Sequence, residues 1–210
     1  NSNQLKKRCD PGGDGALSGT SGWANDVFGY SLSYYEGDYT PVSSSITTAN
    51  SPIAGSAGST FAAQSHNLYN GNIRSMVTAI APFMGAGNIP LGMAYTYDQL
   101  NRITEANAFT SFDTTTNTWN TTGSALGAYH NRFTYDANGN IVTQVRRGAA
   151  TTLAMDSLTY HYSGTNNRLQ YVDDAISPGN YTDDIDDQAT GNYAYDAIGN
   201  LIQDNAEEIA

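Results

Sequence analysis

Over residues 133–141 of the chain, two aromatic residues on either side of a small polar one are followed by a polar turn and an aliphatic residue. Phe133 and Tyr135 lie two residues apart, so they share one face of an extended strand. Asp136 follows directly, and its carboxylate is suited to accept hydrogen bonds from nearby turn amides. Gly139 tolerates the positive φ that a chain reversal requires, and an aliphatic residue then begins the next strand. The pattern predicts a β-hairpin.

The same order of aromatic strand, turn and aliphatic strand recurs along the chain. It predicts hairpins at residues 95–106, 133–145, 158–172 and 193–204. The second Tyr and the aliphatic residue are separated by a constant step, except in the copy at 158–172, whose turn is one residue longer. The motif residues are Tyr97, Asp98, Ile103, Tyr135, Asp136, Gly139, Ile141, Tyr162, Leu169, Tyr195, Asp196, Gly199 and Leu201. A fixed unit with variable connections is typical of repeat architectures.

Composition favours the same fold class. The chain has 15 Tyr and 21 Gly, and only 14% of its residues are charged, which is typical of β-rich proteins. We therefore predict an all-β fold of consecutive antiparallel β-hairpins that form one curved, spiralling sheet. Residues 1–22 are expected to be a flexible or turn-rich end, and 23–210 a single β-repeat domain. Long loops are expected at about 40–65, 107–130 and 173–192.

Two segments before the first strict repeat carry strand signals. Between Val27 and Tyr39, alternate residues such as Phe28 and Tyr30 are apolar, which predicts a half-buried strand with these side chains on one face. The Asn70-Gly71 pair lies between apolar residues and predicts a local hairpin.

The net charge disfavours some classes of partner. Nine basic and twenty acidic residues give a formal charge of −11, which disfavours a nucleic-acid phosphate track and an anionic membrane surface. The chain has no apolar run of about 18 residues and no signal-peptide opening, so no membrane insertion is predicted. The single Cys9 excludes an internal disulfide and a cysteine-cluster metal site.

Candidate chemistry is sparse. The three His residues are scattered, so zinc is unsupported, and the run Asp183–Asp187 lacks the glycine and terminal Glu of a calcium loop. We interpret that run as a solvated acidic loop. Asp98, Asp136 and Asp196 recur at one turn position, which favours turn capping over catalysis. We predict no catalytic site, no metal and no cofactor. A hydrolase with two catalytic carboxylates stays open as an alternative, because such carboxylates are brought together in space and need no fixed separation in the sequence.

The segments 97–103, 135–141 and 195–201 follow the string Tyr-Asp-x-x-Gly/Asn-Arg/Asn-Ile/Leu. From about Trp23 onward, the chain resembles the RHS/YD-repeat family, whose unit runs Tyr-x-Tyr-Asp-x-x-Gly-Arg/Asn-Leu. The resemblance implies a partial RHS-type shell or cell-surface scaffold with no enzymatic activity. It also implies that the parent is a larger bacterial protein, secreted or at the cell surface. The implied partners are the remainder of the parent chain and an enclosed C-terminal toxin or effector.

The chain begins without Met and stops just after its last hairpin, so we expect a segment of a longer protein. Such a strip should have unpaired strand edges, which favour edge-to-edge self-association. The alternative function is a surface carbohydrate-binding or adhesion module, in which Trp23 and Trp119 contact glycans.

Overall fold

The structure is a computed structural model that describes residues 28–35, 38, 66–80, 91–110, 112–113, 118–119, 127–149 and 151–209. The described residues form strands, turns and irregular segments, and none of them is helical, so the fold class is all-β. Contacts within the chain divide it into two compact units, Asn1–Gly127 and Ala128–Ala210. The single domain predicted over 23–210 stays a prediction, and the segments 1–22 and 40–65 lie outside the described residues.

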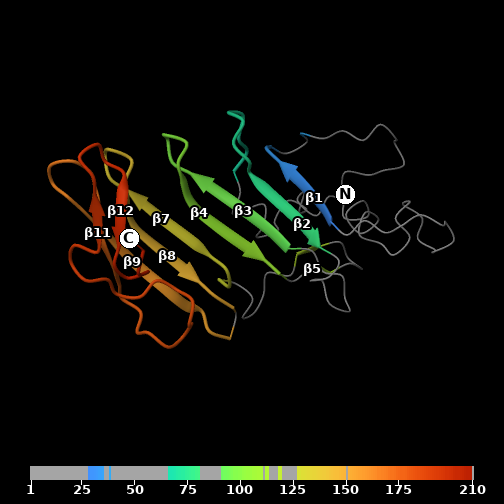
Figure 1. The fold of residues 1–210 in the computed structure, drawn as a ribbon. Helices are drawn as coiled ribbons and strands as arrows, with labels where there is room; N and C mark the ends of the chain where they lie inside the picture. The colour runs from blue at the N-terminus through green and yellow to red at the C-terminus, as the bar shows by residue number, and fades with distance from the viewer. Residues whose placement is uncertain are drawn as a thin grey trace, which may run out of the picture. The chain divides into compact units, whose positions relative to one another are not determined.

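The first unit contains an antiparallel meander in which each strand pairs with the next one in the chain (Figure 1). Its strands are β1 (Phe28–Ser33), β2 (Ser75–Ile80), β3 (Leu91–Tyr97) and β4 (Ile103–Phe109). The hairpin predicted at 95–106 is therefore the turn end of the β3–β4 hairpin. Two short strands, β5 (Phe112–Asp113) and β6 (Thr118–Trp119), pair with each other inside the loop predicted at 107–130.

The second unit repeats this arrangement. Its meander consists of β7 (Asn131–Tyr135), β8 (Ile141–Arg147), β9 (Ala154–Tyr162) and β10 (Leu169–Asp174), again paired in chain order. A further hairpin of β11 (Tyr193–Tyr195) and β12 (Leu201–Asp204) follows the loop predicted at 173–192. The hairpins predicted at 133–145, 158–172 and 193–204 are thus β7–β8, β9–β10 and β11–β12.

The buried face of the first unit includes a row of small side chains. Ser33, Ser75 and Ala94 are directly opposed on neighbouring strands and are 7%, 0% and 0% exposed. Tyr30 belongs to the other face of β1 and is 54% exposed. On the same face as Tyr30, Leu32 and Tyr34 are half-buried, so the predicted half-buried strand is present, but its most buried described side chain, Ser33, lies on the opposite face. Alternation shows that two faces differ, but it does not show which face is covered, and a Tyr can keep its hydroxyl in water.

The core of the second unit combines apolar groups with a buried ion pair. Leu158 and Val172 are 1% and 2% exposed. Asp156 is 1% exposed, and its Oδ2 accepts a hydrogen bond from Arg146 Nε at 2.5 Å. This hydrogen bond is the largest cause that raises the pKa of Arg146. A buried carboxylate is tolerated here because a guanidinium neutralises it directly.

The Asn70-Gly71 pair forms a turn but not the predicted hairpin. Gly71 has φ +88°, and Asn72 N donates to the Asn70 side-chain oxygen at 3.0 Å. The described residue range 66–74 contains no strand before this turn, and β2 begins only at Ser75. The turn instead lies between Leu68 and Arg74, whose N–H groups donate to the carbonyl groups of residues 34 and 33 at the end of β1. It leads the chain into β2.

Candidate functional site: the turns of the repeated hairpins

The four repeated hairpins share one irregularity at the same place. In each, the strand register shifts next to the second Tyr of the motif, so one strand carries an extra residue there. After the shift, that Tyr is opposed by the aliphatic residue that begins the second strand. The four pairs are Tyr97–Ile103, Tyr135–Ile141, Tyr162–Leu169 and Tyr195–Leu201. A β-bulge bends its strand and increases the local right-handed twist, so each hairpin has a built-in bend at its turn end.

The three strict turns also share their backbone hydrogen bonds. Asp136 N donates to Asn140 O at 3.0 Å, and Gly139 N donates to Asp136 O at 3.2 Å. The turns that begin at Asp98 and Asp196 make the same two bonds. The fourth turn residue has positive φ in all three, namely 62° at Asn101, 93° at Gly139 and 100° at Gly199. Glycine and asparagine occupy this position because they adopt positive φ most readily.

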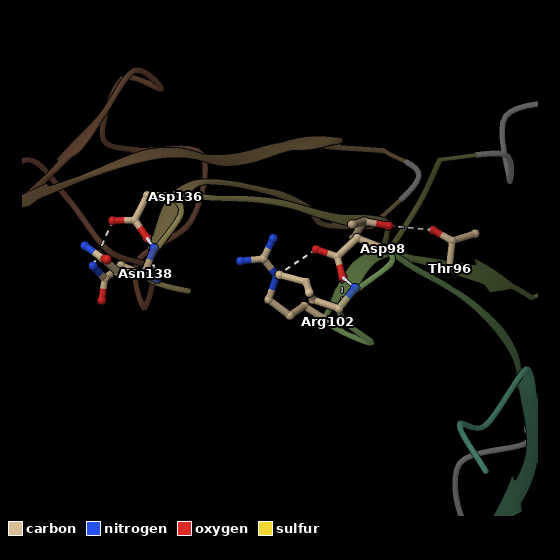
Figure 2. Close-up of polar contacts among 8 residues, drawn as sticks. Thr96, Asp98, Arg102, Asp136 and Asn138 are labelled. Atoms are coloured by element: carbon tan, nitrogen blue, oxygen red, sulfur yellow. Dashed lines mark hydrogen bonds and ion pairs between the residues drawn. The ribbon is translucent and has the colours of Figure 1, made fainter. Parts of the chain in front are cut away.

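The Asp carboxylate closes each strict turn from inside. Asp136 Oδ1 accepts hydrogen bonds from Asn138 N and Asn140 N, both at 2.9 Å, and Oδ2 accepts one from the Asn140 side-chain amide at 2.8 Å. Asp98 binds its own turn in the same manner, with Arg102 Nε donating to Oδ2 at 2.6 Å. Figure 2 shows Asp98 beside Arg102 and Asp136 beside Asn138, each within its own turn. These are the contacts that turn capping requires.

Hydrogen bonds to the charged form hold the pKa of all three aspartates below the ordinary value of 3.8. The largest cause is the Asn140 side chain for Asp136, and the backbone amides of Arg102 and Asn200 for Asp98 and Asp196. A general acid needs a pKa that is raised toward neutrality. The geometry and the direction of these pKa shifts therefore match a conformational role and not proton donation.

The turn of the loose copy is built differently. Ser163 replaces the aspartate. Its hydroxyl accepts a long hydrogen bond from Thr165 N at 3.4 Å and shares a hydrogen bond with the Thr165 hydroxyl at 3.0 Å. The backbone still closes through Ser163 N to Arg168 O at 2.8 Å, and Asn167 has φ 54°. The positive-φ residue is therefore retained although the carboxylate is lost, which indicates that the backbone shape is the common element.

Within each unit, neighbouring turns are linked by side chains. In the first unit, Asn70 Nδ2 donates to Asn101 Oδ1 at 2.6 Å. In the second, Asn138 Nδ2 donates to Asn167 Oδ1 at 3.3 Å. In both links, the acceptor is the positive-φ Asn of the following turn. A row of polar side chains thus connects consecutive turns.

The motif tyrosines make a second kind of link. Tyr97 Oη donates to Ile73 O at 2.8 Å, and Tyr195 Oη donates to Leu169 O at 3.0 Å. Each acceptor is the aliphatic residue that ends the preceding turn. Arg168 also lies 5.4 Å from the centre of the Tyr195 ring. Burial raises the pKa of both tyrosines, so their hydroxyls stay protonated and act as donors.

Sequence reasoning missed the role of the acidic loop. Asp187 Oδ1 accepts a hydrogen bond from Asp174 N at 2.7 Å, and Gln188 Oε1 accepts one from Val172 N at 3.0 Å. Both amides belong to the outer edge of β10. The loop therefore covers a strand edge and is more than a solvated acidic run. A single Asp-Gln pair in an irregular segment has no periodicity that would have predicted this contact.

The structure describes only some of the residues that the sequence suggested for metal or glycan binding. Among the described residues, no group of three or more His, Cys, Asp and Glu is arranged to hold a metal ion. Trp23 and Cys9 lie outside the described residues. The backbone of Trp119 pairs with Phe112 in the β5–β6 ribbon, but its side chain is not described. The predicted glycan contacts of Trp23 and Trp119 therefore stay predictions.

The described part of the chain contains no helix that is long and apolar enough to span a bilayer. Comparison with known proteins finds no matching family model, no matching curated protein and no matching solved structure.

Proposed function

We propose that this chain is a non-enzymatic structural segment of an RHS/YD-repeat shell or cell-surface scaffold, which encloses or presents a C-terminal toxin or effector. The observation that carries the proposal is the turn shared by the four hairpins. Each combines a bulge, a Tyr–aliphatic pair and a positive-φ residue at equivalent positions. Sequence repetition is thus accompanied by repetition of backbone geometry.

A wall needs regular curvature, and the bulges are a source of it. Each bulge adds bend and twist at the same end of its hairpin. Equal increments in consecutive units accumulate in one direction, as in solenoid proteins. The Tyr-Asp turns would then determine how strongly the sheet curves, and the variable loops between hairpins would project from the wall.

The links between turns favour a passive, rigid role. Asn138 and Asn167 connect two turns of the second unit, and Tyr195 connects the last hairpin to Leu169. The carboxylates of Asp136 and Asp196 are each occupied by their own turns, with pKa values held low. Asp136 and Asp196 are therefore unsuited to be the catalytic pair of the hydrolase alternative, in which two carboxylates face one substrate.

The partners and location follow from the same proposal. The remainder of the parent chain would continue the sheet, and the toxin or effector would lie within it or be presented by it. The parent would be secreted or displayed on a bacterial cell surface. A net charge of −11 on this segment would keep the wall soluble.

Electron cryo-microscopy of the product of the complete reading frame tests the proposal. The expected result is a hollow body whose wall contains these hairpins, with the Tyr-Asp turns in rows along it. Protease digestion of the same sample should leave the enclosed region intact until the wall is unfolded. A compact particle without a lumen, in which residues 95–204 do not belong to a continuous sheet, would contradict the proposal.

One observation favours the second candidate function, glycan binding. The rings of Tyr35 and Tyr69 stack at 5.0 Å, although Tyr69 is 78% exposed. Exposed aromatic faces are suited to contact the apolar face of a sugar ring. A glycan array tests this with the wild-type chain, Tyr69→Ala, Trp119→Ala and the exposed control Tyr129→Ala. Binding that Tyr69→Ala and Trp119→Ala abolish, and that Tyr129→Ala retains, would support the adhesion module. Absence of binding to every glycan on the array would refute this second function.

A further inference from the structure

The sequence Asn-Gly-Asn-Ile occurs twice in the chain, at residues 70–73 and 138–141. In both copies the Asn-Gly pair is exposed and the glycine has positive φ, 88° at Gly71 and 93° at Gly139. A Cβ built on either glycine would meet no atom within 4 Å, so the space beside both is open. The two copies are therefore matched in sequence, glycine φ and exposure, and they differ in their hydrogen bonds.

An asparagine that is followed by glycine can react with its own backbone. The glycine nitrogen, once it has lost its proton, attacks Cγ of the asparagine and closes a cyclic succinimide. Glycine favours this reaction because it has no Cβ to hinder the approach. Removal of the proton requires an N–H group that is free of its hydrogen bond, as in amide hydrogen exchange. The hydrogen bond of the glycine N–H thus controls the reaction.

The two copies differ at this N–H group. Gly139 N donates to Asp136 O at 3.2 Å, inside the closed turn of the β7–β8 hairpin. Within the part of the chain that the structure describes, Gly71 N donates no hydrogen bond. In the folded chain, the Gly139 proton is therefore held by the turn, whereas the Gly71 proton is accessible to hydroxide.

The asparagine carbonyl groups differ as well. Asn70 Oδ1 accepts a hydrogen bond from Asn72 N at 3.0 Å, which folds the side chain back toward the Gly71 peptide. A donor at this oxygen also stabilises the negative charge that develops on it during attack. Asn138 instead donates from Nδ2 to Asn167 Oδ1 at 3.3 Å, and no described residue donates to its Oδ1. Both reacting groups therefore favour the first copy.

We propose that Asn70 is a modification site that converts spontaneously to aspartate and isoaspartate, and that the turn around Asn138 suppresses the same reaction. Gly71 N gives its proton to hydroxide and forms a bond to Cγ of Asn70. The bond from Cγ to Nδ2 breaks, and Nδ2 takes up a proton and leaves as ammonia. Water then opens the succinimide at either carbonyl, so the reaction consumes one water and releases one ammonia. The inference does not depend on the proposed function.

The modification acts on the link between two turns of the first unit. Asn101 Oδ1 accepts hydrogen bonds from Asn70 Nδ2 at 2.6 Å and from Asn72 Nδ2 at 3.3 Å. Conversion removes the first donor and leaves a carboxylate against the same oxygen. To restore both contacts, the amides of Asn101 and Asn72 would have to turn over together. Isoaspartate also lengthens the backbone within the turn, so conversion should weaken the link.

Peptide mapping by mass spectrometry tests the proposal on the full chain, aged near neutral pH at physiological temperature. In the folded chain, Asn70 should convert about fivefold faster than Asn138, because one hydrogen bond of ordinary strength holds the Gly139 amide. In the urea-unfolded chain, the two identical sequences should convert at closely similar rates. Asn70→Gln should abolish conversion at residue 70, because its longer side chain closes the ring poorly, and should leave the rate at Asn138 unchanged.

Amide hydrogen exchange of the two glycines checks the cause independently. The Gly139 amide should be protected in the folded chain, and the Gly71 amide should exchange close to its unfolded rate. The proposal is overturned if Asn138 converts as fast as Asn70 in the folded chain, or if the difference persists after unfolding. Equal protection of the Gly71 and Gly139 amides would overturn it too.

Discussion

Replacement of Gly139 by Ala isolates the backbone requirement of the repeated turn. Gly139 has φ +93°, and a Cβ built on it would meet no atom within 4 Å. The substitution therefore introduces no clash, and its cost is conformational. An L-residue with left-handed backbone costs about 1–2 kcal/mol. Alanine also reduces the entropy of the unfolded chain, which returns about 0.4–1 kcal/mol. We expect Gly139→Ala to lower the free energy of unfolding by about 1 kcal/mol.

Gly164→Ala is the matched control. Gly164 is exposed in the turn of the loose copy, has no atom within 4 Å of a built Cβ and has no positive φ. The same substitution should therefore stabilise the protein by about 0.4–1 kcal/mol. The unfolded-state contribution is common to both variants, so the difference between them reports the backbone strain alone, about 1–2 kcal/mol.

Urea unfolding followed by circular dichroism and tyrosine fluorescence measures both variants. Gly139 and Gly164 belong to the same compact unit, so both report on the same transition. The slope of free energy against urea should be unchanged, because neither variant alters the surface exposed on unfolding. Equal free energies for the two variants would refute the reasoning, since they would show that residue 139 does not need positive φ.

The remaining predictions concern other contacts of the repeats. Tyr195→Phe should lower the free energy of unfolding by about 0.5–1.5 kcal/mol, because it leaves Leu169 O without its donor; exposed Tyr129→Phe should have no effect on the same urea assay. Gly148→Ala should destabilise by about 1–3 kcal/mol through overlap with the Tyr181 ring, and a prior Tyr181→Ala should remove most of that cost in a double-mutant cycle. Ser75→Ala should stabilise by about 1 kcal/mol, because the fully buried Ser75 hydroxyl has no hydrogen-bond partner in the described structure; an unchanged thermal midpoint would contradict this. Urea midpoints should fall with pH below about 4, since the low pKa values of Asp98, Asp136 and Asp196 stabilise the fold only while these groups are ionised, and Asp136→Asn should reduce that slope.

The sequence predicted the hairpins well, because their determinants are local. Tyr135, Asp136 and Gly139 lie within five consecutive positions, and each acts on its own turn. Strand alternation, a capping carboxylate and a residue with positive φ are all visible without knowledge of the rest of the chain. The four hairpins and the turn role of the aspartates could therefore be read from the pattern.

Features that depend on distant contacts could not be predicted in this way. Tyr30 is exposed and Ser33 is buried because of what covers each face of β1, which alternation does not encode. The position of the loop that covers the β10 edge depends on the hydrogen bond from the Tyr181 hydroxyl to Thr152 O, a contact across 29 positions of the chain. The Asn138–Asn167 link likewise arises only when two turns are placed side by side. Such contacts require the three-dimensional register of the strands.

The central claim is that the repeated aspartates shape turns and perform no reaction. Carbon-detected NMR titration of the Asp98, Asp136 and Asp196 carboxyl groups tests it most directly. The account predicts that all three titrate below the ordinary value of 3.8, because turn amides stabilise each charged carboxylate. One aspartate of the three with a pKa raised toward neutrality would contradict it, since that is the signature of a carboxyl group prepared to donate a proton.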